Sequence, residues 1–189
     1  LPISVKTRLG YSRDELETWL PALLETEVSA VTIHARTRQE MSKVPAHWER
    51  LRLAVKIRDE LDSQTLIIGN GDVRDMTHAR QLVEETGVDG IMLGRAIFGN
   101  PFLFSSPGFD LKNPPRSNLD IRLHILVEHT KLFEELLGEV KSFAIMKKHY
   151  KAYLVGWPGV DELRVNLMET KDAREVENIV DKYLSSMLS

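Results

Sequence analysis

The chain has 189 residues, of which 42% are hydrophobic and 28% charged, and its formal net charge is −3. This is the composition of a water-soluble globular protein, and the charge argues against a globally basic surface, so any nucleic-acid site must be a local patch. The absence of cysteine excludes disulfide bonds and cysteine-ligated zinc, and no apolar run reaches the roughly 20 residues needed to span a bilayer. We therefore expect a cytoplasmic protein without membrane association.

The first 105 residues alternate short β-branched runs with amphipathic stretches. The predicted strands are nearly all apolar, as strands buried on both faces of a parallel sheet are: Ile3–Arg8, Ala30–His34, Thr65–Gly69 and Gly90–Leu93. Helical periodicity between them predicts helices near 16–24, 46–61 and 73–86. This alternation predicts four β/α units with a parallel sheet.

Four such units make half of a TIM (β/α)₈ barrel, since a closed barrel needs about 250 residues. Residues 1–105 are therefore predicted to form a half barrel whose outer strands are unpaired edges. The chain opens directly on the apolar segment Leu1–Val5, without a start methionine, and we expect a further part of the barrel before it.

The second part of the chain has a different pattern. Residues 106–118 are rich in proline, serine, glycine and asparagine, which predicts a linker. After it, helical periodicity alone predicts helices near 119–137, 139–154, 160–168 and 171–187. Residues 119–189 are therefore predicted to form an all-α helical bundle domain.

Each of the four predicted strands ends in polar or cationic residues. Because functional groups of (β/α) barrels lie at the carboxyl ends of the strands, these ends together suggest an anion site. Glycine after the last two strands lets backbone N–H groups approach a phosphate, and an arginine can hold its oxygens bidentately. The residues concerned are Lys6, Arg8, His34, Arg36, Asn70, Gly71, Asp72, Gly94 and Arg95.

Each of these residues also has a simpler interpretation. Lys6 can be a strand-end charge, His34 a structural histidine, and Asp72 the cap of the following helix. Arg36 and Arg38 are as well explained by a solvated loop as by contact with RNA or a flavin. The remaining histidines show no metal-like spacing, so no metal site is expected.

Four segments resemble the dihydrouridine synthase family in sequence, order and spacing. They are Val5–Gly10, Val31–Arg38, Ile68–Asp72 and Asp89–Arg95, the last followed by Asn100-Pro101, and they match the last four strands of that family's barrel. The resemblance covers about residues 1–104. Met146–Tyr150 and the stretch from Gly159 to Arg164 resemble the family's C-terminal domain less specifically.

The resemblance implies a cofactor, a reaction and a set of contacts. It implies FMN bound by Lys6, His34, Asn70, Gly71, Asp72, Gly94 and Arg95, with NADPH reducing the FMN and a hydride passing to C6 of a uracil in tRNA. In the family a cysteine then protonates C5, and it lies on the part of the barrel that precedes Lys6. The chain contains no cysteine. The first four strands of the family's barrel, which carry half of the flavin pocket, are missing with that cysteine. We therefore expect the isolated chain to be inactive and to bind FMN weakly.

The helical part is the expected site of tRNA contact. Lys147, Lys148 and Lys151 recur at near-helical spacing, with Lys141 expected on the same helix. Arg36 and Arg164 extend the predicted RNA-binding set. A solvated helix face would explain the lysines equally simply, and Tyr150 and Tyr153 are either core residues or platforms for bases.

Two other functions remain open at this stage. One is a different FMN- or phosphate-binding barrel, such as a dihydroorotate dehydrogenase-like protein, although a basic helical tail is unnecessary for a small-molecule enzyme. The other is a non-catalytic RNA-binding or interaction module that pairs with its missing N-terminal half or with a second copy of the chain.

Overall fold

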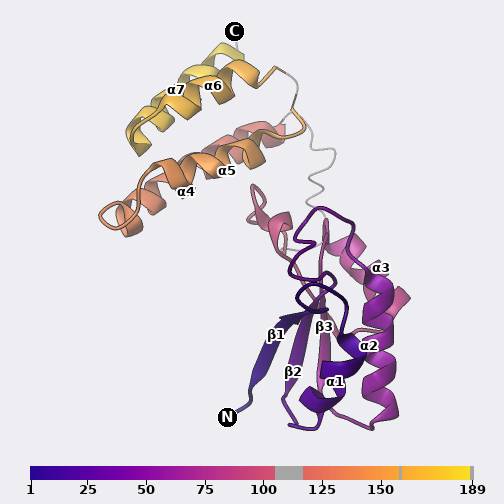
Figure 1. The fold of residues 1–189 in the computed structure, drawn as a ribbon. Coiled ribbons are helices and arrows are strands. Elements are labelled where there is room, and N and C mark those ends of the chain that lie inside the picture. Colours follow the sequence, from indigo (N-terminus) through magenta and orange to yellow (C-terminus); the bar gives the residue numbers. More distant parts are fainter. Residues whose placement is uncertain (105–116, 158, 188–189) are drawn as a thin grey trace. The chain divides into compact units, whose positions relative to one another are not determined.

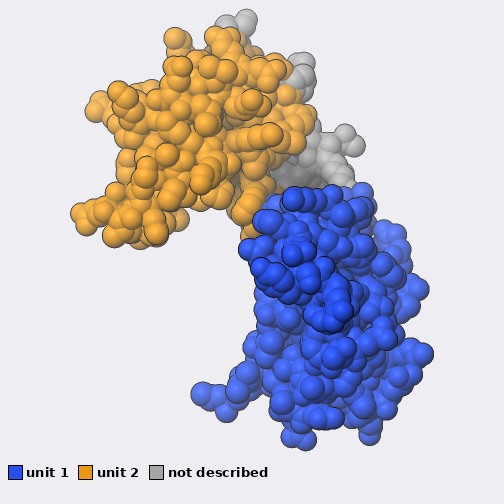
Figure 2. All heavy atoms as spheres, viewed as in Figure 1, with its two compact units in different colours: residues 1–96 blue, residues 97–189 orange. Residues whose placement is uncertain are grey.

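The computed structural model describes residues 1–104, 117–157 and 159–187. The chain divides into two compact units, Leu1–Ala96 and Ile97–Ser189 (Figure 2). The predicted linker, 106–118, lies almost entirely outside the described residues.

The first unit is an α/β structure with one parallel sheet (Figure 1). Its four strands stand in the order β1-β2-β3-β4, which confirms the predicted parallel arrangement. A short 3₁₀ helix, Arg95–Ile97, follows the last strand. The elements are β1 (Ser4–Arg8), α1 (Leu16–Leu24), β2 (Ala30–His34), α2 (Trp48–Glu60), β3 (Leu66–Asn70), α3 (Met76–Thr86) and β4 (Gly90–Met92).

The two faces of this sheet have different surroundings. Val31, Ile33 and Ile67 point to the side of the helices, where they are fully buried in a core with residues of α1 and α2. The alternate positions form the opposite face, on which Leu66 and Met92 remain 49% and 37% exposed. Because side chains alternate along a strand, this second face carries the polar strand-end residues.

The start of α3 differs from the sequence-based expectation. The helix expected from residue 73 begins at Met76, because the carboxylate of Asp75 accepts the backbone N–H of His78 at 2.8 Å and caps α3. The interpretation of Asp72 as that cap is therefore wrong. The start of α1 at Leu16 agrees with the expectation, and the carboxylate of Asp14 accepts the N–H of Leu16 at 3.0 Å.

Among its described residues, the second unit has four helices around a shared apolar core. They are α4 (Ser117–Leu137), α5 (Ala144–Leu154), α6 (Asp161–Glu169) and α7 (Ala173–Met187). Tyr150 and Tyr153 belong to this core at 0% and 4% exposure, which excludes them as stacking platforms for bases. The carboxylate of Asp172 accepts the N–H of Glu175 at 2.8 Å and caps α7.

The segment between α4 and α5 is a turn rather than the first turn of a helix. Two N–H groups, of Val140 and Lys141, donate to the carbonyl of Leu137, and α5 begins only at Ala144. The expectation that Lys141 shares a helix with Lys148 is therefore wrong. None of the helices in the described part of the chain combines the length and apolar character needed to cross a bilayer.

Candidate functional site

The carboxyl ends of the strands bring polar side chains together at one edge of the sheet. Arg8, His34 and Asn70 stand opposite one another in the strand register. The ammonium group of Lys6 donates to Oδ1 of Asn70 at 3.3 Å, and Nδ2 of Asn70 donates to the carbonyl of Met92 at 2.7 Å. These bonds connect β1, β3 and β4 and fix which way the Asn70 amide points.

A hollow of about 770 Å³ lies at this edge. Six of the seven residues expected to bind a cofactor line it: His34, Asn70, Gly71, Asp72, Gly94 and Arg95. The seventh, Lys6, lines a neighbouring hollow, and Arg8 lines both. Arginines outnumber carboxylates in the wall of the first hollow, which therefore suits an anion.

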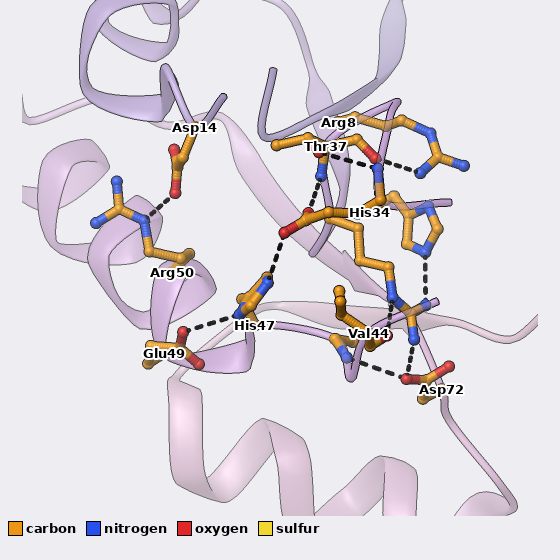
Figure 3. A network of polar contacts seen from close by, with 12 residues as sticks. Arg8, Asp14, His34, Thr37, Val44, His47, Glu49, Arg50 and Asp72 are labelled. Atoms are coloured by element: carbon orange, nitrogen blue, oxygen red, sulfur yellow. Dashed lines mark hydrogen bonds and ion pairs between the residues drawn. The ribbon is translucent and has the colours of Figure 1, made fainter. Parts of the chain in front are cut away.

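The carboxylate of Asp72 joins three groups in this hollow, and Figure 3 shows it at one end of a larger polar network. Oδ2 accepts hydrogen bonds from the guanidinium of Arg36 and from the N–H of Ala46, the latter at 3.0 Å, and Oδ1 accepts from Arg95 at 3.1 Å. Burial alone would raise the pKa of Asp72, but the bonds from Arg36 and Ala46 hold this pKa below its ordinary value. Asp72 therefore stays ionised and holds Arg95 at the hollow.

Arg36 lies beneath the surface, although the sequence predicts that it contacts RNA. Its side chain is only 3% exposed, and it donates to the carbonyl of Val44 at 2.7 Å and to Asp72. A third nitrogen lies 3.4 Å from Nε2 of His34. The guanidinium thus joins the end of β2, the loop before α2 and the turn after β3, and it offers almost no surface to an RNA strand.

The imidazole of His34 is held in its neutral form. Burial, Arg8, Lys6 and Arg36 together lower its pKa to about 4. Because a guanidinium can only donate, Nε2 of His34 is the acceptor toward Arg36, and we infer that Nδ1 carries the proton. His34 therefore presents a hydrogen-bond donor without adding a charge.

The two glycines of Gly69-Asn70-Gly71 have separate structural causes. A Cβ on Gly69 would lie 2.5 Å from the ring of Trp48, so this glycine makes room for the indole. The indole N–H of Trp48 in turn donates to the carbonyl of Gly71 at 3.0 Å. Gly71 itself has φ +136°, and a Cβ there would lie 2.8 Å from Cβ of Ala46. Packing therefore sets the shape of this turn.

Gly94 stands in contrast to Gly71. A Cβ on Gly94 would meet no described atom within 4 Å, and its backbone does not require glycine. Packing among the described residues therefore gives no reason for glycine here. A ligand that approaches the backbone of Gly94 closely would give one.

The structure places the predicted RNA-binding residues of the helical unit on two helices. Lys148 and Lys151 are exposed on α5, and Arg164 is exposed on α6. Lys147 is partly buried and donates to the carbonyl of Met168 at 2.8 Å. Three of the four cations thus remain accessible, while Lys147 also holds α5 against the end of α6.

Several residues of the site had not been singled out as site residues from the sequence. Arg74 and Ser42 line the hollow, Ala46 donates to Asp72, and Trp48 fixes Gly71. A tryptophan at the first position of a helix, with a glycine-rich turn two elements later, was the only available signal.

Comparisons with known proteins agree on one family. The family described as dihydrouridine synthase matches residues 1–188. A probable tRNA-dihydrouridine synthase of Staphylococcus aureus (strain MRSA252) is 39% identical over 189 residues, which are 99% of this chain and 56% of that protein. The probable tRNA-dihydrouridine synthase 2 of Bacillus subtilis (strain 168) is 42% identical over 185 residues, covering 97% of this chain and 55% of that protein. The chain spans about half the length of the curated relatives it matches.

Proposed function

Because this chain belongs to the dihydrouridine synthase family, we propose that it is part of a flavin-dependent enzyme that reduces uridine to dihydrouridine in tRNA. The observation that carries the proposal is the hollow in which six expected cofactor residues meet. Cofactor, substrate and reductant all belong to this proposal.

The residues of the hollow fit the phosphate end of FMN. Arg95 is 68% exposed in its side chain and is held by Asp72, so it can turn two N–H groups to a phosphate. The space around Gly94 allows the backbone to come close to the same group. Asp72 would repel a phosphate if it were unpaired, but Arg36 and Arg95 together neutralise it.

Lys6 and His34 fit the polar part of the flavin. The Lys6 ammonium can stabilise negative charge near N1 and the C2 carbonyl of a reduced ring, and the Nδ1–H of His34 can donate to the ring or the ribityl chain. Asn70, whose amide is fixed by two bonds, orients Lys6.

Bound FMN, reduced by NADPH, supplies the hydride for C6 of the uracil. The residues of this chain bind and orient the reacting groups. The resemblance assigns the proton for C5 to a cysteine, which this chain lacks. We therefore propose that a group outside the chain supplies this proton and that the isolated chain is inactive. The target uridine must leave the RNA stack to reach a flavin.

The second half of a (β/α)₈ barrel is the proposed context of the four strands. Among the described residues, β1 and β4 are the edges of the sheet, and one face keeps exposed apolar side chains. Four further strands, from another part of a longer protein or from a second copy, would close the barrel around this face.

The helical unit is proposed to contact tRNA through its exposed cations. Lys148 and Lys151 lie three residues apart on α5, which places them on one side of the helix, and Arg164 lies on α6. Each would contact a backbone phosphate, so binding should weaken as salt is raised. We also propose a cytoplasmic location, which suits a tRNA substrate.

The proposal is tested by incubating the flavin-loaded enzyme that contains this chain with unmodified tRNA and NADPH, and then measuring dihydrouridine by mass spectrometry. Dihydrouridine is expected, and dihydroorotate should not be oxidised by the same sample. Oxidation of dihydroorotate without any change in tRNA would instead establish a dihydroorotate dehydrogenase-like enzyme.

A further inference from the structure

A second hollow, of about 560 Å³, lies beside β1 in the first unit. Its lining contains three cations and no carboxylate: Lys6, Thr7, Arg8, Gly10, Tyr11, Trp19 and Arg38. Only Lys6 of these residues belongs to the expected cofactor set. We call this the β1 hollow.

Backbone hydrogen bonds hold the walls of the β1 hollow together. The N–H of Arg38 donates to the carbonyl of Gly10 at 2.9 Å, and the N–H of Gln39 donates to that of Tyr11 at 3.0 Å. The indole of Trp19 donates to the carbonyl of Leu9 at 3.1 Å. The loop after β1 and the loop after β2 are therefore fixed side by side before any ligand binds.

The positive charges in this hollow lack carboxylate partners. Arg8 donates to the carbonyl of Thr37 at 3.0 Å, and the side chain of Arg38 is exposed and bonded to no described residue. Burial and the charges of Arg38 and Arg36 lower the pKa of Arg8. An anion in the hollow would relieve this repulsion.

An exposed aromatic ring stands beside these cations. Tyr11 is 69% exposed, and its ring lines the hollow with the cations. An exposed ring next to unpaired cations is the arrangement with which proteins hold single-stranded nucleic acid, the cations binding phosphates and the ring stacking on a base.

We propose that the β1 hollow binds a phosphodiester of the RNA strand through Arg38 and Arg8, with the adjacent base stacked on Tyr11. This inference rests on the proposed function and adds a substrate subsite to it. The β1 hollow shares Arg8 with the larger hollow in which FMN is proposed to bind. The β1 hollow would therefore hold the nucleotide next to the reacting uridine. The phosphate of a nicotinamide dinucleotide has the same chemistry and is the alternative source of the anion.

The binding of a labelled single-stranded oligouridylate to the chain, followed by fluorescence anisotropy over a range of salt, tests the phosphate contact. Arg38→Gln should weaken binding and lower the slope of log Kd against log salt by about 0.7, the value for one phosphate contact on a single strand. Arg80→Gln is the matched control, because Arg80 is also exposed and has no described partner. Equal slopes for both variants would overturn the phosphate contact.

Tyr11→Leu tests the stacked base. Affinity for the oligouridylate should fall at least about fivefold with the salt slope unchanged, and Tyr11→Phe should restore it. If Tyr11→Phe binds as poorly as Tyr11→Leu, stacking is not the role of this ring.

Steady-state kinetics of the holoenzyme separate the two sources of the phosphate. Arg38→Gln should raise KM for tRNA about tenfold while KM for NADPH stays unchanged. A rise in KM for NADPH alone would show that the hollow serves the dinucleotide. If wild-type enzyme forms dihydrouridine and Arg38→Gln matches Arg80→Gln, the subsite is wrong and the proposed function stands. If no dihydrouridine forms while Arg38→Gln still lowers the salt slope, the proposed function is wrong and the phosphate contact in the β1 hollow stands.

Discussion

Replacing Arg36 by methionine tests the network that organises the candidate site. The change keeps an unbranched apolar stem but removes the guanidinium and with it the bonds to Val44 and Asp72. Hydrogen bonds to charged groups contribute about 1.5–3 kcal/mol each. Since Asp72 is 36% exposed, water can replace part of the loss, and we expect Arg36→Met to cost about 2–3 kcal/mol in total.

A loss of this size should lower the Tm of the unit by about 10 °C or more. Circular dichroism during thermal unfolding measures it, and Arg80→Met, an exposed arginine on α3, should leave Tm within about 2–4 °C. FMN titration should show weaker binding in Arg36→Met, because Asp72 would then repel the phosphate. The double variant with Asp72→Asn should recover part of this affinity. An unchanged Tm and FMN affinity in Arg36→Met would refute the reasoning.

Three further predictions concern separate parts of the molecule. Gly71→Ala should destabilise the first unit by about 1–3 kcal/mol because of its positive φ, whereas Gly94→Ala should unfold like wild type in urea yet bind FMN at least tenfold more weakly. The pKa of His34 is lowered to about 4, so the stability that its neutral form contributes is complete above about pH 6.5 and is lost as pH falls toward 4. His34→Gln should therefore lose less stability than wild type between pH 6.5 and 4.5, and parallel pH curves would exclude this. The double variant Lys148→Gln, Lys151→Gln should bind tRNA more weakly in filter binding, and the slope of log Kd against log salt should fall by the amount of about one to two phosphate contacts. An unchanged slope would remove α5 from the interface.

The strands and the meeting of their polar ends could be predicted because both follow from local pattern. Apolar β-branched runs gave the parallel sheet, and parallel strands place their carboxyl ends at one edge. His34 and Asn70 were therefore expected near each other before any coordinates, and the register pairs them directly.

The role of Arg36 could not be predicted, because its partners lie 8 and 36 positions away in the chain. Its burial depends on how the loop before α2 folds over the turn after β3. The helix start at Asp75 was missed for a simpler reason: Asp72 and Asp75 are both good capping residues, and only the left-handed backbone of Asp72 removes it from the choice. A helix was predicted from about residue 139, but residues 138–143 form the turn that follows Gly138, and α5 begins only at Ala144.

The most direct test of the central claim is an NMR titration of the ¹⁵N-labelled chain with FMN. The claim is that the carboxyl ends of the four strands form a flavin phosphate site, and NMR detects binding even when it is weak. The backbone amides of Gly71, Gly94 and Arg95 should shift in a saturable way, while those of Ser63 and Gln64, which precede β3 at the opposite edge of the sheet, should not. Saturable shifts at Ser63 and Gln64 instead, or no shift at millimolar FMN, would contradict the account.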